Sequence, residues 1–311
     1  MKRLVLVVLT AGLLAGSAAG QSRPIQWISN ANQGVAQARR TRLPLLFYVR
    51  GRSRGNESSI VRDQRRAFRD PMVSKIATSF FVPVRLANSP QTRTLLQNMG
   101  APTASDQLVV ATPEGDLIGT ISAMQARSAG GLAKALMEQF RQYRAALYKK
   151  DVKPILDSKT SSSRDLIAAL RLVDRFVIVE ADEAVATLLE RPGLPKTVRK
   201  QVYKTLATLS TPKSVAALLD VATSDKLAAK ALARCTPAGA KAMLPALDPA
   251  DAAKLVIVYE AVTKICRVPK KRPRGFWNHA NEELQIQEIE RVKDLVQKKA
   301  ARWEKTYGKL R

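Results

Sequence analysis

The sequence predicts an α/β domain over residues 25–148 and an all-α domain over residues 165–311, joined by a linker over residues 149–164. In the first part, short continuous apolar runs alternate with helical patterns, which is typical of strands covered on both faces. In the second part, apolar residues recur at helical spacing almost throughout, so no strand is needed. The stretch between them is rich in lysine and serine, which favours a domain boundary near residue 150.

The first 20 residues have the pattern of a secretory signal peptide. Lys2 and Arg3 give a basic start, an apolar run extends from Leu4 to Leu14, and small residues follow up to Gly20. The run is shorter than the roughly 20 residues that a transmembrane helix needs. The small-residue region favours cleavage over the alternative, an uncleaved anchor, so we expect a periplasmic or secreted protein without a transmembrane anchor.

The chain is strongly basic, with a formal net charge of +26. Removing the two charges of Lys2 and Arg3 leaves +24, and such a field attracts polyanions. Candidate partners are therefore a protein of the cell envelope or an anionic polymer, although scattered charge that only maintains solubility is the alternative. Aromatic residues make up 5% and are not interleaved with basic runs, which disfavours nucleic-acid binding.

The α/β domain is expected to open with a helix and a buried strand. Ser29 is a plausible N-cap, and Ala31, Val35 and Ala38 recur on one helical face. After Pro44, the apolar run Leu45–Val49 predicts the central strand.

Two helices and three further strands follow in the sequence. We expect helices over residues 57–68 and from Asp70-Pro71 to Ser79, because aspartate followed by proline is a helix-start signal. Residues 80–86 predict a second strand, in which Pro83 weakens the centre or marks a bulge. Residues 108–111 and 117–121 predict a hairpin around the turn at 112–116, and a closing helix carries apolar residues from Leu132 to Leu147 on one face.

This order of elements, with its motifs, resembles the secreted thioredoxin-like proteins. The motifs are Trp27, Ala31, Ala38, Pro44-Leu45-Leu46, Phe68-x-Asp70-Pro71-x-Val73, Phe81-Val82-Pro83-Val84 and Thr112-Pro113-Glu114-Gly115, and they span roughly two fifths of the chain. The resemblance implies a thioredoxin fold with a Cys-x-x-Cys pair after the central strand and a cis-proline just before the third strand.

Both features of the family's active site are altered in this sequence. The Cys-x-x-Cys positions fall near Ser53 and Asn56, and Pro102 is the nearest candidate for the cis-proline, although it lies early and could belong to a longer loop over residues 100–107. Dithiol exchange needs a thiolate nucleophile and a second, resolving thiol, which serine and asparagine cannot replace. We therefore expect a redox-inactive binding or scaffolding module and assign no catalytic residue. The alternative is an enzyme with a rebuilt non-redox site around Ser53.

Two basic segments are candidate contact sites for anions or a partner. Arg50, Arg52 and Arg54 precede a helix N-terminus, where free amides favour an anion and where Ser53 and Asn56 could cap the helix. The second segment contains Lys270, Lys271, Arg272 and Arg274 and is expected to form an exposed loop. For both segments the alternative is a solvated loop without a ligand.

The all-α domain contains a weak internal repeat. Ser210-Thr211-Pro212 and Cys235-Thr236-Pro237 are each followed by a small-residue helical pattern, and Asp248-Pro249 is expected to start a further helix in the same way. Over about 180–266 the pattern resembles HEAT-like helical repeats, with an irregular helical bundle as the alternative. Residues 278–307 predict a long final helix that caps the repeats or binds a partner.

The remaining chemically active residues are few. Cys235 and Cys266 are the only cysteines, and an exported protein permits a disulfide between them; two buried thiols are the alternative. The single histidine, His279, cannot by itself build a zinc site and is expected on the surface. No nucleotide, hydrolase or metalloprotease motif is present, so we expect no cofactor and no metal.

Overall fold

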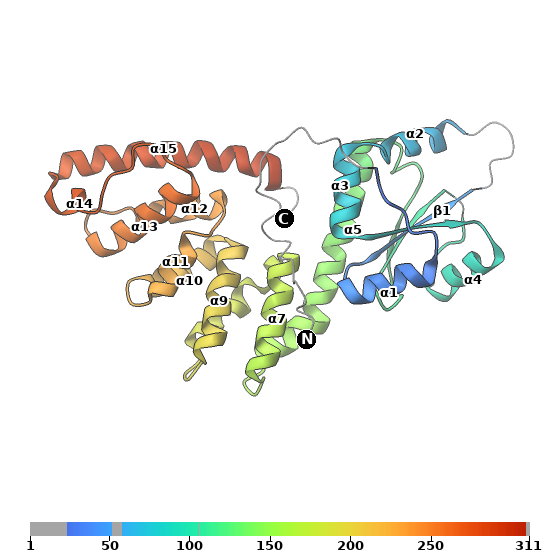
Figure 1. The fold of residues 1–311 in the computed structure, drawn as a ribbon, viewed down its shortest axis with the longest axis horizontal. Helices are drawn as coiled ribbons and strands as arrows, with labels where there is room; N and C mark the ends of the chain where they lie inside the picture. Colours follow the sequence, from blue (N-terminus) through green and yellow to red (C-terminus); the bar gives the residue numbers. More distant parts are fainter. Residues whose placement is uncertain (1–23, 52–57, 105, 309–311) are drawn as a thin grey trace, which may run out of the picture. The chain divides into compact units, whose positions relative to one another are not determined.

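The computed structural model describes residues 24–51, 58–104 and 106–308, and the expected signal peptide over residues 1–20 lies outside them. The chain divides into two compact units, one up to Arg144 and one from Ala145 onward. The first unit is mixed α/β, and the second contains helices but no strand among its described residues (Figure 1).

The first unit is built on a four-stranded mixed sheet with the strand order β2-β1-β3-β4. β1 (Leu45–Arg50) pairs in parallel with β2 (Val82–Ala87) and antiparallel with β3 (Leu108–Ala111). β3 in turn pairs antiparallel with β4 (Leu117–Ile121), which confirms the predicted hairpin.

The central position of β1 follows from its apolar run. Residues 45–49 are all buried and only Arg50 at the end is exposed, as expected for an inner strand covered on both faces. Pro83 lies in β2, at the edge of the sheet, where the missing amide does not interrupt a ladder on both sides. Its carbonyl accepts a hydrogen bond from the backbone amide of Ile28 at 3.0 Å.

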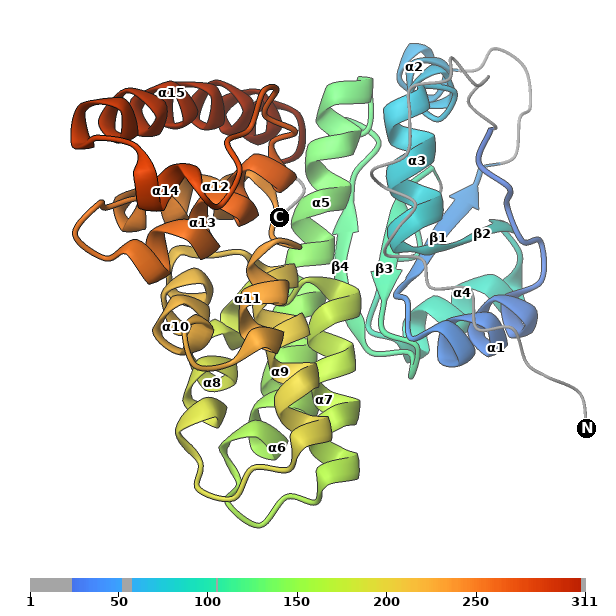
Figure 2. The same ribbon diagram turned by 60° about the vertical axis from the view of Figure 1, so that its left-hand side comes forward.

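Helices cover both faces of the sheet (Figures 1 and 2). On one face, Phe47 and Val84 share a buried cluster with Ala38 of α1 and Leu96 of α4. The helices α3 and α5 contact each other through aromatic rings, with the centroids of Phe80 and Phe140 4.7 Å apart. The helices of this unit are α1 (Ala31–Thr41), α2 (Ser59–Ala67), α3 (Pro71–Phe80), α4 (Pro90–Asn98) and α5 (Ala129–Leu147).

The helix starts confirm one predicted cap and correct another. Asp70 caps α3 as expected, since its side chain accepts hydrogen bonds from the amides of Met72 and Val73. The N-cap of α1 is Asn30 and not Ser29, because the Asn30 Oδ1 accepts the hydrogen bond of Gln33. The helix α4 was not predicted from the sequence, although its start at Ser89-Pro90 has the same capping residue followed by proline.

The second unit consists of short helices followed by one long helix. No strand occurs among its described residues, which agrees with the prediction from the sequence. In order, its elements are the π-helical turn η1 (Tyr148–Val152), α6 (Lys153–Asp157), α7 (Ser163–Phe176), η2 (Val179–Ala181), α8 (Asp182–Thr187), η3 (Leu188–Glu190), α9 (Lys196–Leu209), α10 (Pro212–Ala222), α11 (Lys226–Leu232), α12 (Pro237–Met243), η4 (Leu244–Ala246), α13 (Ala252–Ile265), α14 (Phe276–His279) and α15 (Glu282–Tyr307).

The Thr-Pro repeats start helices as predicted. Thr211 caps α10 by accepting a hydrogen bond from the amide of Ser214 at 3.0 Å, and Thr236 caps α12 in the same way. The third start differs from the prediction. The Asp248 carboxylate accepts a hydrogen bond from the amide of Ala250 within a turn, and Asp251 is the residue that caps α13.

The segment 149–164 differs from the expected linker, because most of it is helical. Val152 in η1 and Leu156 in α6 are buried, and the Arg191 guanidinium donates hydrogen bonds to the carbonyls of Leu156 and Ser158. Burial of these two apolar residues and the hydrogen bonds of Arg191 hold this polar stretch on the helical unit. Among the described residues, no helix is long and apolar enough to span a membrane.

Candidate functional site

The carboxyl end of β1, where the expected active-site loop begins, is organised around Asp106. One oxygen of its carboxylate, Oδ1, accepts hydrogen bonds from the Tyr48 hydroxyl at 3.1 Å and from the Gly51 amide at 3.2 Å. The Asp106 carbonyl accepts a further hydrogen bond from Gln64 Nε2 at 3.1 Å, and the Asp106 amide donates to the Val49 carbonyl at 2.7 Å. Asp106 thereby ties β1, α2 and the start of β3 together.

Asp106 holds this position in the left-handed backbone region, with a φ of 60°. Aspartate is one of the few residues besides glycine that visit this region readily, because its short side chain bonds locally. Around Asp106, the Gln107 side chain donates a hydrogen bond to the Pro102 carbonyl. The residues immediately before β3 are thus Asp106 and Gln107, and Pro102 lies exposed further back in the loop. No described peptide bond, that of Pro102 included, is cis.

Tyr48 is fixed as a hydrogen-bond donor. Burial, followed by the charge and hydrogen bond of Asp106, raises the pKa of Tyr48 to about 12, against the opposing effect of Arg65. Its ring packs against Phe68 and Trp27, with centroids 5.0 and 5.8 Å away. A phenol with this pKa stays protonated at neutral pH, so it is poorly matched to general-base or nucleophilic work. The cluster holds the end of β1 in place and offers no visible acid–base chemistry.

We expect Asp106→Ala to lower the free energy of unfolding by about 1–3 kcal/mol, because the buried hydroxyl of Tyr48 and the Gly51 amide lose their acceptor. Asp106→Asn keeps an acceptor oxygen and tolerates the positive φ, so its loss is expected to stay below about 1 kcal/mol. The measurement is urea unfolding of a variant in which Trp27 is the only tryptophan. Equal losses in the two variants would contradict a role for the acceptor geometry.

Several predicted site residues lie outside the described residues or have another role. Ser53, Asn56, Arg52 and Arg54 are outside the described residues. Arg50 is exposed at the end of β1. The expected caps of α2, Ser53 and Asn56, are corrected, because Ser58 Oγ accepts the hydrogen bond from the Val61 amide at 3.4 Å.

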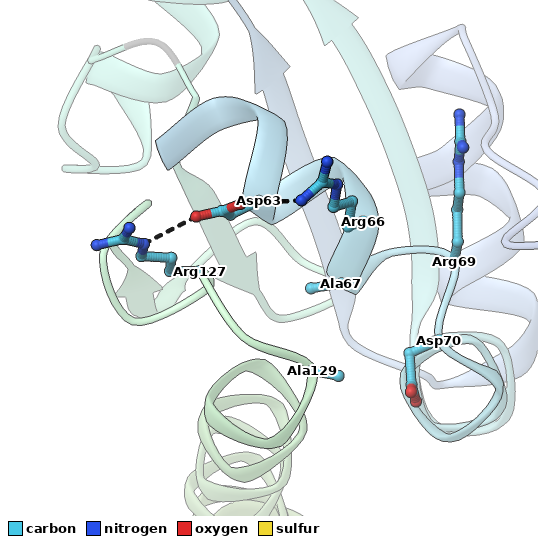
Figure 3. A pocket seen from close by; sticks show the side chains of 7 residues that line it. All are labelled: Asp63, Arg66, Ala67, Arg69, Asp70, Arg127 and Ala129. Atoms are coloured by element: carbon cyan, nitrogen blue, oxygen red, sulfur yellow. Dashed lines mark hydrogen bonds and ion pairs between the residues drawn. The ribbon is translucent and has the colours of Figure 1, made fainter. Parts of the chain in front are cut away.

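A second feature next to this cluster is an arginine-lined pocket of about 340 Å³. Asp63 of α2 lies between two guanidinium groups, with Arg127 Nε 2.9 Å and Arg66 Nη1 3.8 Å from its carboxylate oxygens (Figure 3). The Arg69 side chain extends away from Asp63, and the Asp70 carboxylate is occupied in capping α3 (Figure 3). The lining residues are Asp63, Arg66, Ala67, Arg69, Asp70, Arg127 and Ala129.

The second basic segment lies on one loop, as predicted, but two of its cations are bound internally. Arg274 makes a two-pronged ion pair with Glu260, at 2.6 and 2.8 Å, and Arg272 lies 3.6 Å from Glu288. Lys270 and Lys271 are exposed. Neutralising all four residues would therefore also remove contacts that hold the loop on the helical unit.

The cysteines and the histidine offer no assembled site. Cys235 and Cys266 are both buried thiols, and burial raises the pKa of Cys266. The Cys235 thiol lies 3.9 Å from the Ala231 carbonyl, within the second unit. His279 is exposed at the end of α14, and the described residues contain no group of histidine, cysteine and acidic side chains that could hold a metal ion.

Sequence reasoning missed Tyr48, Gln64 and Asp106, as well as the pocket between Asp63 and Arg127. Asp106 could have been singled out because it lies just before an apolar strand, and aspartate is common in turns at such positions. Comparison with known proteins adds no assignment, since no protein-family model, no curated protein and no solved structure matches the chain.

Proposed function

We propose that this chain is an exported, redox-inactive thioredoxin-like protein that acts as a protein-binding or scaffolding module. The order of its elements supports the fold assignment, because an N-terminal helix is followed by a parallel β1–β2 pair and an antiparallel β3–β4 hairpin with a closing helix. This is the order that the resemblance implies.

The observation that carries the proposal is the absence of cysteine from the α/β domain, residues 25–148. The sequence has two cysteines, at positions 235 and 266, and both belong to the helical unit. Thiol–disulfide exchange requires a thiolate at the site, and Asp106 with Tyr48 supplies a hydrogen-bonded anchor instead. A domain of this kind keeps its framework and uses its surface for contacts.

The helical unit supports a HEAT-like assignment through its packing order. From α9 to α13 each helix contacts the next or the next but one, as in the pairs α9–α11, α10–α12 and α11–α13. Such stacking buries an apolar stripe between neighbours and leaves an extended surface for a partner. This surface and the α/β domain together suit a scaffold.

A redox assay separates this proposal from an oxidoreductase. The Cys235→Ser/Cys266→Ser double variant and the wild-type protein are compared for reduction of insulin and for oxidation of a peptide dithiol. We expect no turnover above the uncatalysed rate from either protein. Turnover that survives the loss of both cysteines would contradict the proposal.

A pull-down from cell-envelope extract at two salt concentrations tests the binding role. Recovery of one defined protein that persists at the higher salt concentration is expected for a scaffold. Diffuse recovery that is lost with salt would instead favour an anionic polymer as the partner, because polyanion binding falls steeply with ionic strength.

A further inference from the structure

The α2–α3 surface of the first unit combines an excess of guanidinium groups with a pocket. Arg62, Arg66 and Arg69 recur at i, i+4 and i+7, which places them on one side of α2 and its extension, and all three are exposed. Arg127 joins them from the segment before α5. The acidic groups among them, Asp63 and Asp70, are already engaged with Arg127 and with the first turn of α3.

The internal ion pair shows which chemical group this pocket accepts. Asp63 presents a carboxylate 2.9 Å from Arg127 and 3.8 Å from Arg66, and the two arginine side chains are 50% and 74% exposed. Each planar guanidinium has further donors that a single carboxylate leaves free, and its fork geometry matches carboxylates. Arg69 lines the same pocket without an ion pair to Asp63 (Figure 3). A second carboxylate therefore has donors available here.

Two exposed methionines, Met72 and Met124, are linked through their backbones to Asp70 and Arg127, which line the pocket. They favour a protein partner over a polymer. Met72 is 54% exposed and Met124 is 62% exposed, which is more than Leu117, Leu284 and Ile286, the other exposed large apolar residues in the described part of the chain. The Met72 amide donates to the carboxylate of Asp70, and the Met124 carbonyl accepts from the amide of Arg127. Methionine is a flexible apolar contact used at adaptable binding surfaces, and a purely anionic polymer has nothing to bury against it.

We propose that this surface, formed by Arg66, Arg69 and Arg127 with Met72 and Met124, binds a protein segment that carries both acidic and apolar side chains. The inference rests on the proposed binding function and names the chemistry of its partner. A carboxylate enters the arginine pocket, and neighbouring apolar side chains pack on the methionines. Charge complementarity brings the segment to the surface, and the apolar contacts select it over other polyanions.

The test uses full-length protein and fluorescent synthetic peptides in anisotropy titrations. One peptide repeats Glu-Glu-Leu, a control of equal charge repeats Glu-Glu-Ser, and inorganic polyphosphate is the competing polyanion. We expect the leucine peptide to bind about tenfold more tightly than the serine peptide, in line with partial burial of apolar side chains. Equal affinity for the two peptides, or preferential binding of polyphosphate, would overturn the inference.

Variants locate the binding on this surface. Arg66→Gln/Arg127→Gln is expected to weaken binding of the leucine peptide about tenfold or more, whereas Met72→Ser/Met124→Ser is expected to remove the preference for leucine over serine. Arg40→Gln/Arg93→Gln, on α1 and α4, removes the same charge elsewhere in the unit and should leave the preference intact.

Asp63→Asn provides a variant that gains affinity, so the inference does not depend on losses alone. Removing the internal carboxylate releases Arg66 and Arg127 and is expected to tighten binding several-fold. Weaker binding by this variant, or equal losses in the α2 and control pairs, would overturn the inference. The two proposals can fail separately. If the protein is redox-inactive and recovers one envelope protein, but Arg66→Gln/Arg127→Gln does not affect this binding, the proposed function stands and the proposed surface is refuted.

Discussion

Glu288→Ala is expected to lower the free energy of unfolding of the helical unit by about 3 kcal/mol, because it removes the acceptor at the centre of a buried polar network. The Glu288 side chain is only 4% exposed. Its Oε1 accepts hydrogen bonds from the Tyr259 hydroxyl and from Arg291 Nη2, both at 2.7 Å, and its Oε2 accepts from Arg291 Nε at 2.9 Å. Without the carboxylate, these donors are left without their acceptor.

The same network holds the basic loop over residues 269–274. The amide of Arg272 donates to the Tyr259 hydroxyl at 2.6 Å, and Arg291 donates to the carbonyls of Pro269 and Lys270 at 3.3 Å. We place the expected loss at the lower end of the range for a broken buried pair, since Arg291 is 37% exposed and can regain water. Urea unfolding measured by far-ultraviolet circular dichroism checks the value. A loss below about 1 kcal/mol would contradict the network's role.

A second buried carboxylate in the same unit provides a matched control. Asp174 is 5% exposed and has Lys204 at 3.1 Å and Gln201 at 2.8 Å, but no arginine fork. Burial raises the pKa of Asp174 in spite of these partners. Burial also acts on Glu288, but there the hydrogen bonds from Arg291 and Tyr259 outweigh it and lower the pKa.

Because the pKa of Glu288 is lowered and that of Asp174 is raised, we expect the two carboxyl groups to affect stability in opposite ways as the pH falls. A carboxyl group with a lowered pKa contributes stability above its usual pKa of 4.5 and loses it as the pH falls through the folded-state pKa. A carboxyl group with a raised pKa disfavours the folded state while it is ionised. We therefore expect Asp174→Asn to be neutral or stabilising at neutral pH and Glu288→Gln to be destabilising. The deficit of Glu288→Gln should shrink in acid, and losses of equal size at neutral pH would contradict this assignment.

The sequence was sufficient for elements whose signals are local. The apolar run after Pro44 predicted β1, the Thr112–Asp116 turn predicted the β3–β4 hairpin, and the Asp-Pro and Thr-Pro pairs predicted three helix starts. Each of these signals lies within a few residues of the structure that it specifies. Where two cap candidates lie close together, as for Ser29 and Asn30, composition alone does not choose between them.

The candidate site could not be predicted in this way, because its contacts join distant segments. Tyr48 and Asp106 are 58 positions apart, and Asp63 and Arg127 are 64 positions apart. The first pair forms when the sheet brings β1 next to the residues preceding β3, and the second forms when α2 meets the segment before α5. The residues singled out from the sequence, Ser53 and Asn56, lie outside the described residues.

Phe47 lies at the middle of β1, the strand on which the sheet and the candidate site are built. Its side chain is fully buried, and in the strand register it lies between Val84 of β2 and Val109 of β3. Ala38 of α1 and Leu96 of α4 belong to the same cluster. Side chains alternate along a strand, so Tyr48 points to the other face, and the two neighbours anchor opposite layers of the unit.

Phe47→Ala is expected to lower the free energy of unfolding of the first unit by about 3–5 kcal/mol, through lost burial and an unfilled cavity. Phe47→Leu retains most of the apolar volume and is expected to cost less than about 1.5 kcal/mol. Urea unfolding followed by Trp27 fluorescence, in a variant lacking the other tryptophans, reports on this unit because the Trp27 ring contacts Phe68 and Tyr48. If the alanine variant lost no more than the leucine variant, β1 would not be the central strand of the core. Binding of the Glu-Glu-Leu peptide should be lost at a lower urea concentration in Phe47→Ala than in Phe47→Leu, in step with unfolding of the unit. The reason is that the arginine pocket exists only where the sheet has positioned α2 and the segment before α5.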